Sequence, residues 1–87
     1  MEIQIDPHTL ERASERGSNA KEIEEVLLTG ITGVAKGSRK MKSKIFSYRS
    51  MRQGKFYDEK KVEVYYIEEA DKIITVTVYV FYGKWEE

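Results

Sequence analysis

Cysteine is absent from this 87-residue sequence, which excludes a disulfide framework and any site that needs a thiolate as nucleophile or ligand. Small secreted domains usually depend on disulfides, so we expect a cytoplasmic protein. The chain also lacks an apolar run of the roughly 20 residues that span a bilayer. Its first residues, MEIQID, lack the basic and apolar parts of a signal peptide. We therefore expect no membrane partner.

Histidine occurs once, as His8, and one histidine without cysteine argues against a zinc site. The acidic residues do not have the spacing of a calcium-binding loop. The sequence also contains no phosphate-binding glycine loop, no Ser-His-Asp order and no paired-carboxylate signature. We expect neither a metal ion nor a cofactor.

The chain also has no net charge, because 15 basic residues balance 15 acidic ones. The charges are nevertheless unevenly distributed. Residues 36–61 contain ten basic side chains opposed only by Asp58 and Glu59, a local charge of +8, and the remainder of the chain carries −8. Such a segment can bind phosphate, bind an acidic partner, or pair with the acidic helices of the same protein.

A first helix is predicted over residues 7–16. Asp6 can cap its free amides, and Pro7 suits the first helical position. Gly17 is placed to end it in the left-handed conformation.

A second helix is predicted over residues 20–29. Asn19 and Glu22 have the spacing of a capping box, and Gly30 follows the last apolar position. Three apolar side chains of the two helices are expected in the core: Leu10, Val26 and Leu27.

After residue 30 the apolar period changes to that of strands. Strands are predicted over 1–5, 31–35, 44–49, 61–68 and 73–82. The last two should pair as a hairpin, with Val64, Val76 and Val78 buried. The order of elements predicts an α+β fold with two N-terminal helices packed on an antiparallel sheet of about four strands. One domain should span residues 1–87.

Helical spacing places His8, Arg12 and Arg16 in one column, each four residues from the next. Glu11 and Glu15 form a parallel acidic column, so one interpretation is a solvated salt-bridge face. The other is a phosphate-binding face. Two guanidinium groups can clamp a phosphate, and His8 can transfer a proton near neutral pH.

Basic and aromatic side chains alternate between residues 36 and 61. Charged edge strands protect a sheet from aggregation, but the density of charge here favours a nucleic-acid surface, where lysines follow phosphates and rings stack on bases. We expect the basic run 39–44 and the helical column to lie on the same side. Candidate nucleic-acid contacts are Arg39, Lys40, Lys42, Arg49 and Tyr57.

The sequence resembles a prokaryotic family of small domains of unknown function. Family members read H-x-x-x-R-x-x-E-R-G-I-S, then E-V-x-x-V-L, then a basic hairpin, and end on I-x-V-x-T-V-Y. The matching segments here are 8–17, 22–27 and 73–79, and the resemblance extends from about Ile5 to Tyr82. The chain departs from the family pattern at residues 18–19, where Ser-Asn replaces the usual Ile-Ser.

That family is similar in outline to the RelE/ParE and BrnT toxin superfamily, in which N-terminal helices pack against a curved antiparallel sheet. Such toxins include metal-independent ribonucleases. The resemblance therefore implies a toxin-like component of a toxin–antitoxin system that cleaves or binds RNA and is restrained by an acidic antitoxin. The alternative is a non-catalytic module that binds nucleic acid or an acidic protein partner, because fold alone does not determine function.

For cleavage, attack of a ribose 2′-hydroxyl on the adjacent phosphate needs proton transfer and cations near the developing charge. The resemblance assigns proton transfer to His8 and the phosphate to Arg12 and Arg16. It assigns charge stabilisation to Lys44 or Lys61, which match basic positions of the family only approximately.

Overall fold

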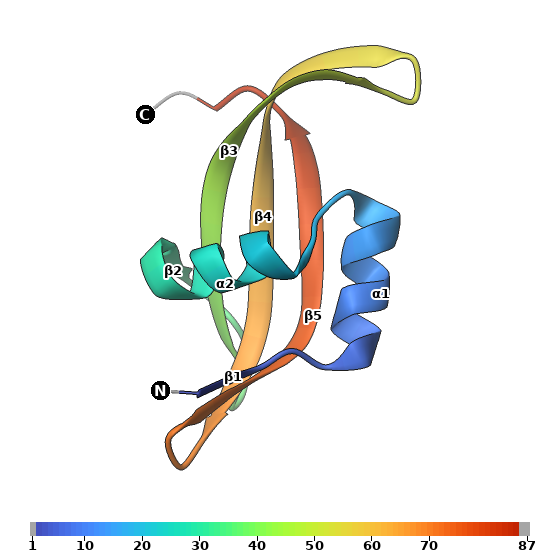
Figure 1. The fold of residues 1–87 in the computed structure, drawn as a ribbon. Coiled ribbons are helices and arrows are strands. Elements are labelled where there is room, and N and C mark those ends of the chain that lie inside the picture. The colour runs from blue at the N-terminus through green and yellow to red at the C-terminus, as the bar shows by residue number, and fades with distance from the viewer. Residues whose placement is uncertain (1, 86–87) are drawn as a thin grey trace.

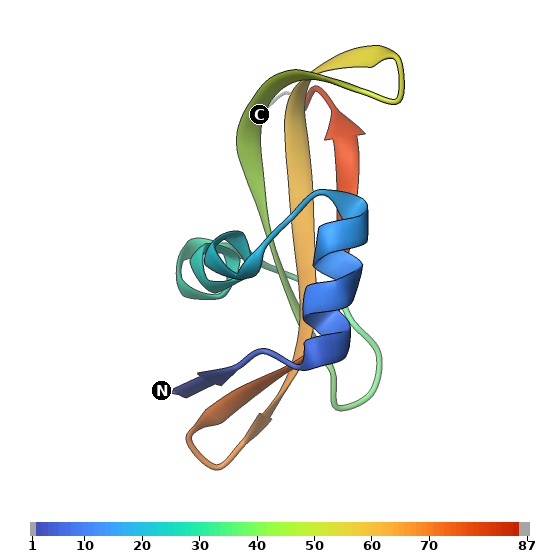
Figure 2. The ribbon, with the colours of Figure 1, turned by 45° about the vertical axis from the view of Figure 1, so that its right-hand side comes forward.

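The computed structural model describes residues 2–85 as two helices on one five-stranded sheet (Figures 1 and 2). Met1, at the start of the first predicted strand, and residues 86–87 lie outside the described residues. In chain order the elements are β1 (Glu2–Gln4), α1 (Pro7–Arg16), α2 (Ala20–Thr29), β2 (Ile31–Gly33), β3 (Lys40–Arg52), β4 (Lys55–Glu69) and β5 (Lys72–Gly83). In the sheet the strand order is β1-β5-β4-β3-β2.

The α+β class, both helices and the pairing of the last two strands are confirmed. The prediction of an antiparallel sheet of about four strands is wrong, because the sheet has five strands and is mixed. β1 runs parallel to β5, with Ile3 opposite Ile73. These two strands come from opposite ends of the chain, so no short hairpin turn dictates their direction.

Both helices begin and end where their caps predict. The Asp6 carboxylate accepts a hydrogen bond from the backbone N–H of His8 (2.8 Å), and Gly17 ends α1 with φ = +93°. The Asn19 side chain accepts from the backbone N–H of Glu22 (2.9 Å). Local hydrogen bonds thus determine both helix starts.

The core lies between the two helices and one face of the sheet. Its buried apolar residues are Ala13, Ile23, Val26, Leu27, Val62, Val64, Tyr66, Ile73 and Val78. The predicted burial of Val26, Leu27, Val64 and Val78 is confirmed. The predicted burial of Leu10 is wrong, since its side chain is 40% exposed. α1 lies along β5 at the border of the sheet and buries its Thr9–Ala13 side instead.

The predicted burial of Val76 is also wrong, because β5 contains a bulge at this residue. Thr75 lies opposite Tyr66 and Thr77 opposite Tyr65, which leaves Val76 without a cross-strand partner. One extra residue reverses the alternation of side chains. Thr75 and Val78 are therefore both buried, whereas Val76 is only half-buried.

Three side chains from the sheet bind the C-terminus of α1. Each donates a hydrogen bond to one of the final carbonyl oxygens: Arg52 to Glu15 (3.1 Å), Tyr82 to Arg16 (2.7 Å) and Lys60 to Gly17 (2.7 Å). These carbonyls have no partner within the helix and form the negative end of its dipole. Two of the three donors are cations, so charge and hydrogen bonding act together.

Lys60 is the buried cation among these donors, with 7% of its surface exposed. Its ammonium group also pairs with the Glu22 carboxylate at 2.9 Å, and Glu22 accepts a hydrogen bond from the Ser18 hydroxyl (2.8 Å). A buried charge is tolerated only when it is paired and hydrogen-bonded in this way. The contact fixes the α1–α2 connection to β4.

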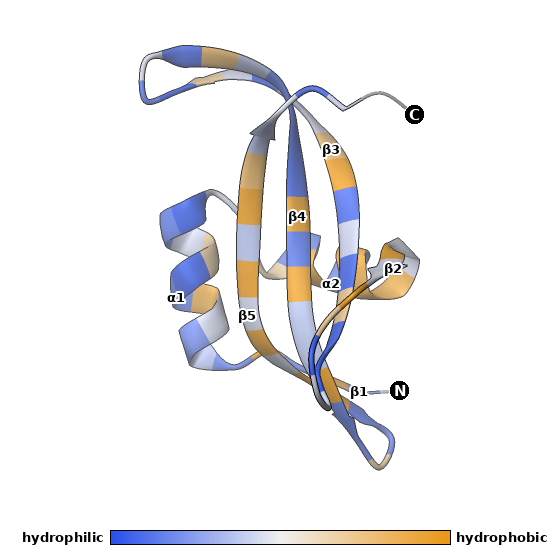
Figure 3. Ribbon diagram, turned by 180° about the vertical axis from the view of Figure 1, so that it is seen from behind, coloured by the Kyte–Doolittle hydropathy of each residue, from blue (hydrophilic) through white to orange (hydrophobic). Residues whose placement is uncertain are grey.

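Both helices cover the same face of the sheet, and no described element packs as a layer on the opposite face (Figure 3). We call this opposite surface of β4 and β5 the open face, formed by Lys61, Glu63, Tyr65, Thr77, Tyr79 and Phe81. The segment between β2 and β3 crosses one end of it. At the other end of the molecule, residues 50–57 form a distal hairpin beyond the end of β5.

Replacing Gly17 with alanine should destabilise the protein more than replacing Gly54. Both glycines have positive φ, +93° and +81°, so each substitution should cost about 1–2 kcal/mol of unfolding free energy from backbone conformation. Only at Gly17 would the new methyl group overlap the Tyr82 hydroxyl, and such overpacking typically costs about 1–3 kcal/mol more. Urea denaturation of the two variants measures the difference. Equal losses would show that the Tyr82 contact does not constrain this turn.

Candidate nucleic-acid interface

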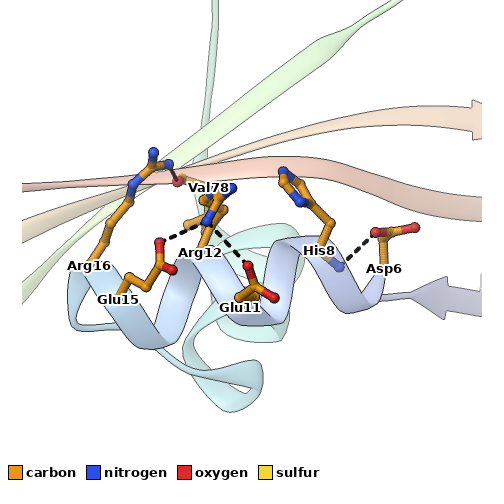
Figure 4. A network of polar contacts seen from close by, with 7 residues as sticks. All are labelled: Asp6, His8, Glu11, Arg12, Glu15, Arg16 and Val78. Carbon is orange, nitrogen blue, oxygen red and sulfur yellow. Dashed lines mark hydrogen bonds and ion pairs between the residues drawn. The ribbon is translucent and has the colours of Figure 1, made fainter.

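The three side chains predicted to form one column on α1, those of His8, Arg12 and Arg16, have different surroundings in the structure (Figure 4). His8 is exposed in the first turn. The Arg12 guanidinium lies 2.8 Å from the Glu15 carboxylate and 3.4 Å from that of Glu11. The salt-bridge interpretation therefore describes the position of Arg12.

Arg16 leaves the column and passes around the outer border of β5. Its Nη1 donates to the backbone oxygen of Val78 (2.7 Å), and its guanidinium lies 4.9 Å from the centroid of the Tyr79 ring. β1 pairs only with residues 72–74 of β5, so the Val78 carbonyl is free to accept this bond. Arg16 thus extends from the helical layer to the open face.

The basic run at the start of β3 is engaged by local partners. Lys40 pairs with Glu68 at 2.8 Å, and this hydrogen bond raises the pKa of Lys40 above its usual value. Lys42 donates to the backbone oxygen of Leu27 (3.0 Å), and Lys44 pairs with Glu25. These contacts attach β3 to β4 and to α2.

The run and the helical column both lie on the helix-covered side of the sheet, because Lys42 and Lys44 contact α2. That one oligonucleotide reaches both groups stays a prediction. α1 lies along β5, whereas the run lies on β3, and β4 separates these strands. The two groups are therefore separated across the width of the sheet but are not on opposite faces. The sequence-predicted catalytic set is divided accordingly, because Lys44 contacts α2 and Lys61 lies on the open face.

The predicted nucleic-acid contacts also separate. Arg39 lies in the β2–β3 loop, and Arg49 lies in a bulge near the other end of β3, with φ = +47°. Within residues 2–85, neither side chain has a hydrogen-bond or ion-pair partner. Tyr57 packs against Tyr82, with 5.5 Å between ring centroids.

The open face brings together charged and aromatic side chains from adjacent strands. Along β4, the Glu63 carboxylate lies 3.7 Å from the Lys61 ammonium and accepts a 3.4 Å hydrogen bond from the Tyr65 hydroxyl. The Tyr65 and Tyr79 rings meet edge to face, with centroids 5.7 Å apart. Phe81 lies opposite Lys61 and is 48% exposed.

The pKa of the Tyr65 hydroxyl is shifted upward by its surroundings. Burial raises the pKa of Tyr65 above that of a free phenol, and the neighbouring Glu63 carboxylate raises it further. The Tyr65 hydroxyl donates a hydrogen bond to Glu63, and Glu63 and Lys61 provide a carboxylate and an ammonium beside it.

The sequence did not predict Glu63, Tyr65, Tyr79 and Phe81 as a group. One signal was available. Val62, Val64 and Tyr66 alternate with Lys61, Glu63 and Tyr65, so burial of the first set places the second on the other face.

No known family model, curated protein or solved structure matches this chain. Neither helix of the described residues is long and apolar enough to cross a membrane. Residues 2–85 also contain no group of three or more acidic or histidine side chains placed to hold a metal ion. The open face and its neighbouring cations form the candidate site.

Arg16→Ala should lower the unfolding free energy by about 1.5–3 kcal/mol, because it removes a charge-assisted hydrogen bond to the Val78 carbonyl. Arg12→Ala is the matched control. It removes an exposed ion pair on the same helix and should cost no more than about 1 kcal/mol. Chemical denaturation measures both losses. A similar small loss for the two variants would show that Arg16 does not anchor α1 to β5.

Proposed function

We propose that the open face binds single-stranded nucleic acid, with RNA as the substrate class. The observation that carries this proposal is the row of three aromatic side chains, Tyr65, Tyr79 and Phe81, on adjacent strands beside Lys61 and Arg16. The sequence resembles a family that is similar in outline to the toxin superfamily, and this resemblance supports RNA over DNA.

Rings and cations on one sheet surface suit the two parts of a nucleotide. Unpaired bases stack on aromatic side chains, each stack contributing about 1–3 kcal/mol, while arginine and lysine follow the phosphates. Tyr79 and Phe81 are 42% and 48% exposed, so both rings are accessible. Arg16 already lies over one of these rings, 4.9 Å from the Tyr79 centroid.

The open face also adjoins exposed aliphatic side chains, Ile31 and Ile45. These suit the alternative, an acidic protein partner. For a single strand, salt dependence gives the number of phosphate contacts, because each contact lowers log K by about 0.7 per unit of log salt concentration. Direct binding of an acidic peptide tests the alternative.

Binding of a fluorescently labelled, unstructured RNA should weaken when either exposed ring is truncated. Tyr79→Ala and Phe81→Ala should each cost about 1–3 kcal/mol of binding free energy. Phe56→Ala is the control, since Phe56 is 53% exposed on the distal hairpin. Fluorescence anisotropy across a salt series, with DNA of the same sequence alongside, measures affinity and the number of phosphate contacts.

A loss of RNA affinity in Phe56→Ala alone, with none in Tyr79→Ala or Phe81→Ala, would exclude the open face as the binding site. If the wild-type protein binds neither RNA nor DNA but does bind an acidic peptide, the protein-partner alternative is favoured.

A second candidate function is metal-independent RNA cleavage, as in a toxin-like nuclease. The contacts that favour it are those of Glu63 with Lys61 (3.7 Å) and Tyr65 (3.4 Å). The Glu63 carboxylate can accept the proton of a ribose 2′-hydroxyl as that oxygen attacks the adjacent phosphorus. The Tyr65 hydroxyl can protonate the departing 5′-oxygen, and Lys61 can stabilise the charge on the phosphorane.

For this candidate, Glu63→Gln should lower the cleavage rate by about 10²–10⁴-fold, the usual contribution of a general base. The assay contains EDTA and scores products with 2′,3′-cyclic phosphate and 5′-hydroxyl ends. His8→Ala is the informative comparison, because the resemblance assigns proton transfer to His8. If His8→Ala loses cleavage and Glu63→Gln keeps full activity, proton transfer is carried out by His8 on α1 and not by Glu63.

A further inference from the structure

A cavity of about 420 Å³ lies where the β2–β3 loop borders the open face. Its lining comes from the loop and from the two central strands: Val34, Ala35, Lys36, Arg39, Tyr65, Thr77 and Tyr79. The volume falls within the range of about 300–1,000 Å³ that is typical of small-molecule sites. Lys61 and Phe81, at the other end of the open face, do not line it.

The walls of this cavity combine aromatic and aliphatic side chains. The Tyr65 and Tyr79 rings stand at 90° to each other, with centroids 5.7 Å apart. Val34 comes from the loop and is 91% exposed. A flat heterocycle placed here would contact ring surface from the sheet and aliphatic surface from the loop.

Three polar side chains of the cavity lining, those of Lys36, Arg39 and Thr77, have no partner among the described residues. Within residues 2–85, no carboxylate pairs with Lys36 or Arg39, and the Thr77 hydroxyl makes no hydrogen bond to another described residue. In this respect Lys36 and Arg39 differ from Lys40, Lys42 and Lys44, which local groups engage. Two such cations at the mouth of the cavity suit a phosphate group, and the rings that line it suit the base of the same nucleotide.

We infer that this cavity is a nucleotide subsite. The base lies against Tyr65 and Tyr79, and the phosphate binds Lys36 and Arg39, whose guanidinium can hold two phosphate oxygens at once. The inference rests on the proposed function and adds to it one defined position on the open face, at which a single nucleoside monophosphate binds.

The experiment titrates the full chain with 5′-AMP, 5′-UMP, adenosine and inorganic phosphate, each followed by NMR or calorimetry. The nucleotides should bind more tightly than adenosine or phosphate alone, because only they fill both parts of the site. Lys36→Gln and Arg39→Gln should each weaken nucleotide binding by roughly tenfold to a hundredfold, the effect of losing one charge-assisted hydrogen bond. Both side chains are exposed on a loop, so folding should be unaffected.

Lys55→Gln is the matched control, since Lys55 is an exposed cation on the distal hairpin. Equal affinities of the nucleotides for Arg39→Gln and Lys55→Gln would overturn the subsite. So would adenosine binding as tightly as AMP, because the cations would then contribute nothing. If RNA still binds and still depends on Tyr79, the subsite alone fails. If nucleotides bind as described but RNA does not, the proposed function fails and the cavity is a site for free nucleotides.

Discussion

The hydrogen bonds at the C-terminus of α1 are the contacts on which the rest of this structure depends. Arg52, Tyr82 and Lys60 reach the end of the helix from β3, β5 and β4, so every long strand contributes one donor. They fix the helix against the border of β5, where the caps at its ends alone could not place it. The position of Arg16 follows, because the same turn directs its side chain around the strand to Tyr79.

The bulge at Val76 determines which side chains form the open face. Before the bulge, Ile73 and Thr75 face the helices; after it, Val78 does. With regular alternation Tyr79 would face the helices and Val78 would face away. One unpaired residue therefore completes the core and at the same time places Tyr79 and Phe81 on the open face, so the β5 part of the site depends on an irregular strand.

The parts of the fold that the sequence predicts are those with local causes. Asp6 and Asn19 cap the helices through bonds spanning two or three residues, so both helix starts could be predicted. The parallel pairing of β1, the exposure of Leu10 and the contacts of Lys44 depend on segments distant in sequence. The same holds for the candidate site, because Arg16 reaches Tyr79 only after α1 has packed on β5, and the charged run proved to be mostly structural.

RNA binding at the open face is tested most directly by residue-by-residue NMR mapping of the protein during titration with a short unstructured RNA. Binding at the open face predicts the largest backbone shift changes at residues 61–65 and 77–81, with smaller changes in the β2–β3 loop. The core residues Ile23 and Val26 of α2 and the distal hairpin should shift little. Changes centred on His8 and Arg12, with none along β4 and β5, would contradict the account and return the nucleic-acid site to the exposed face of α1.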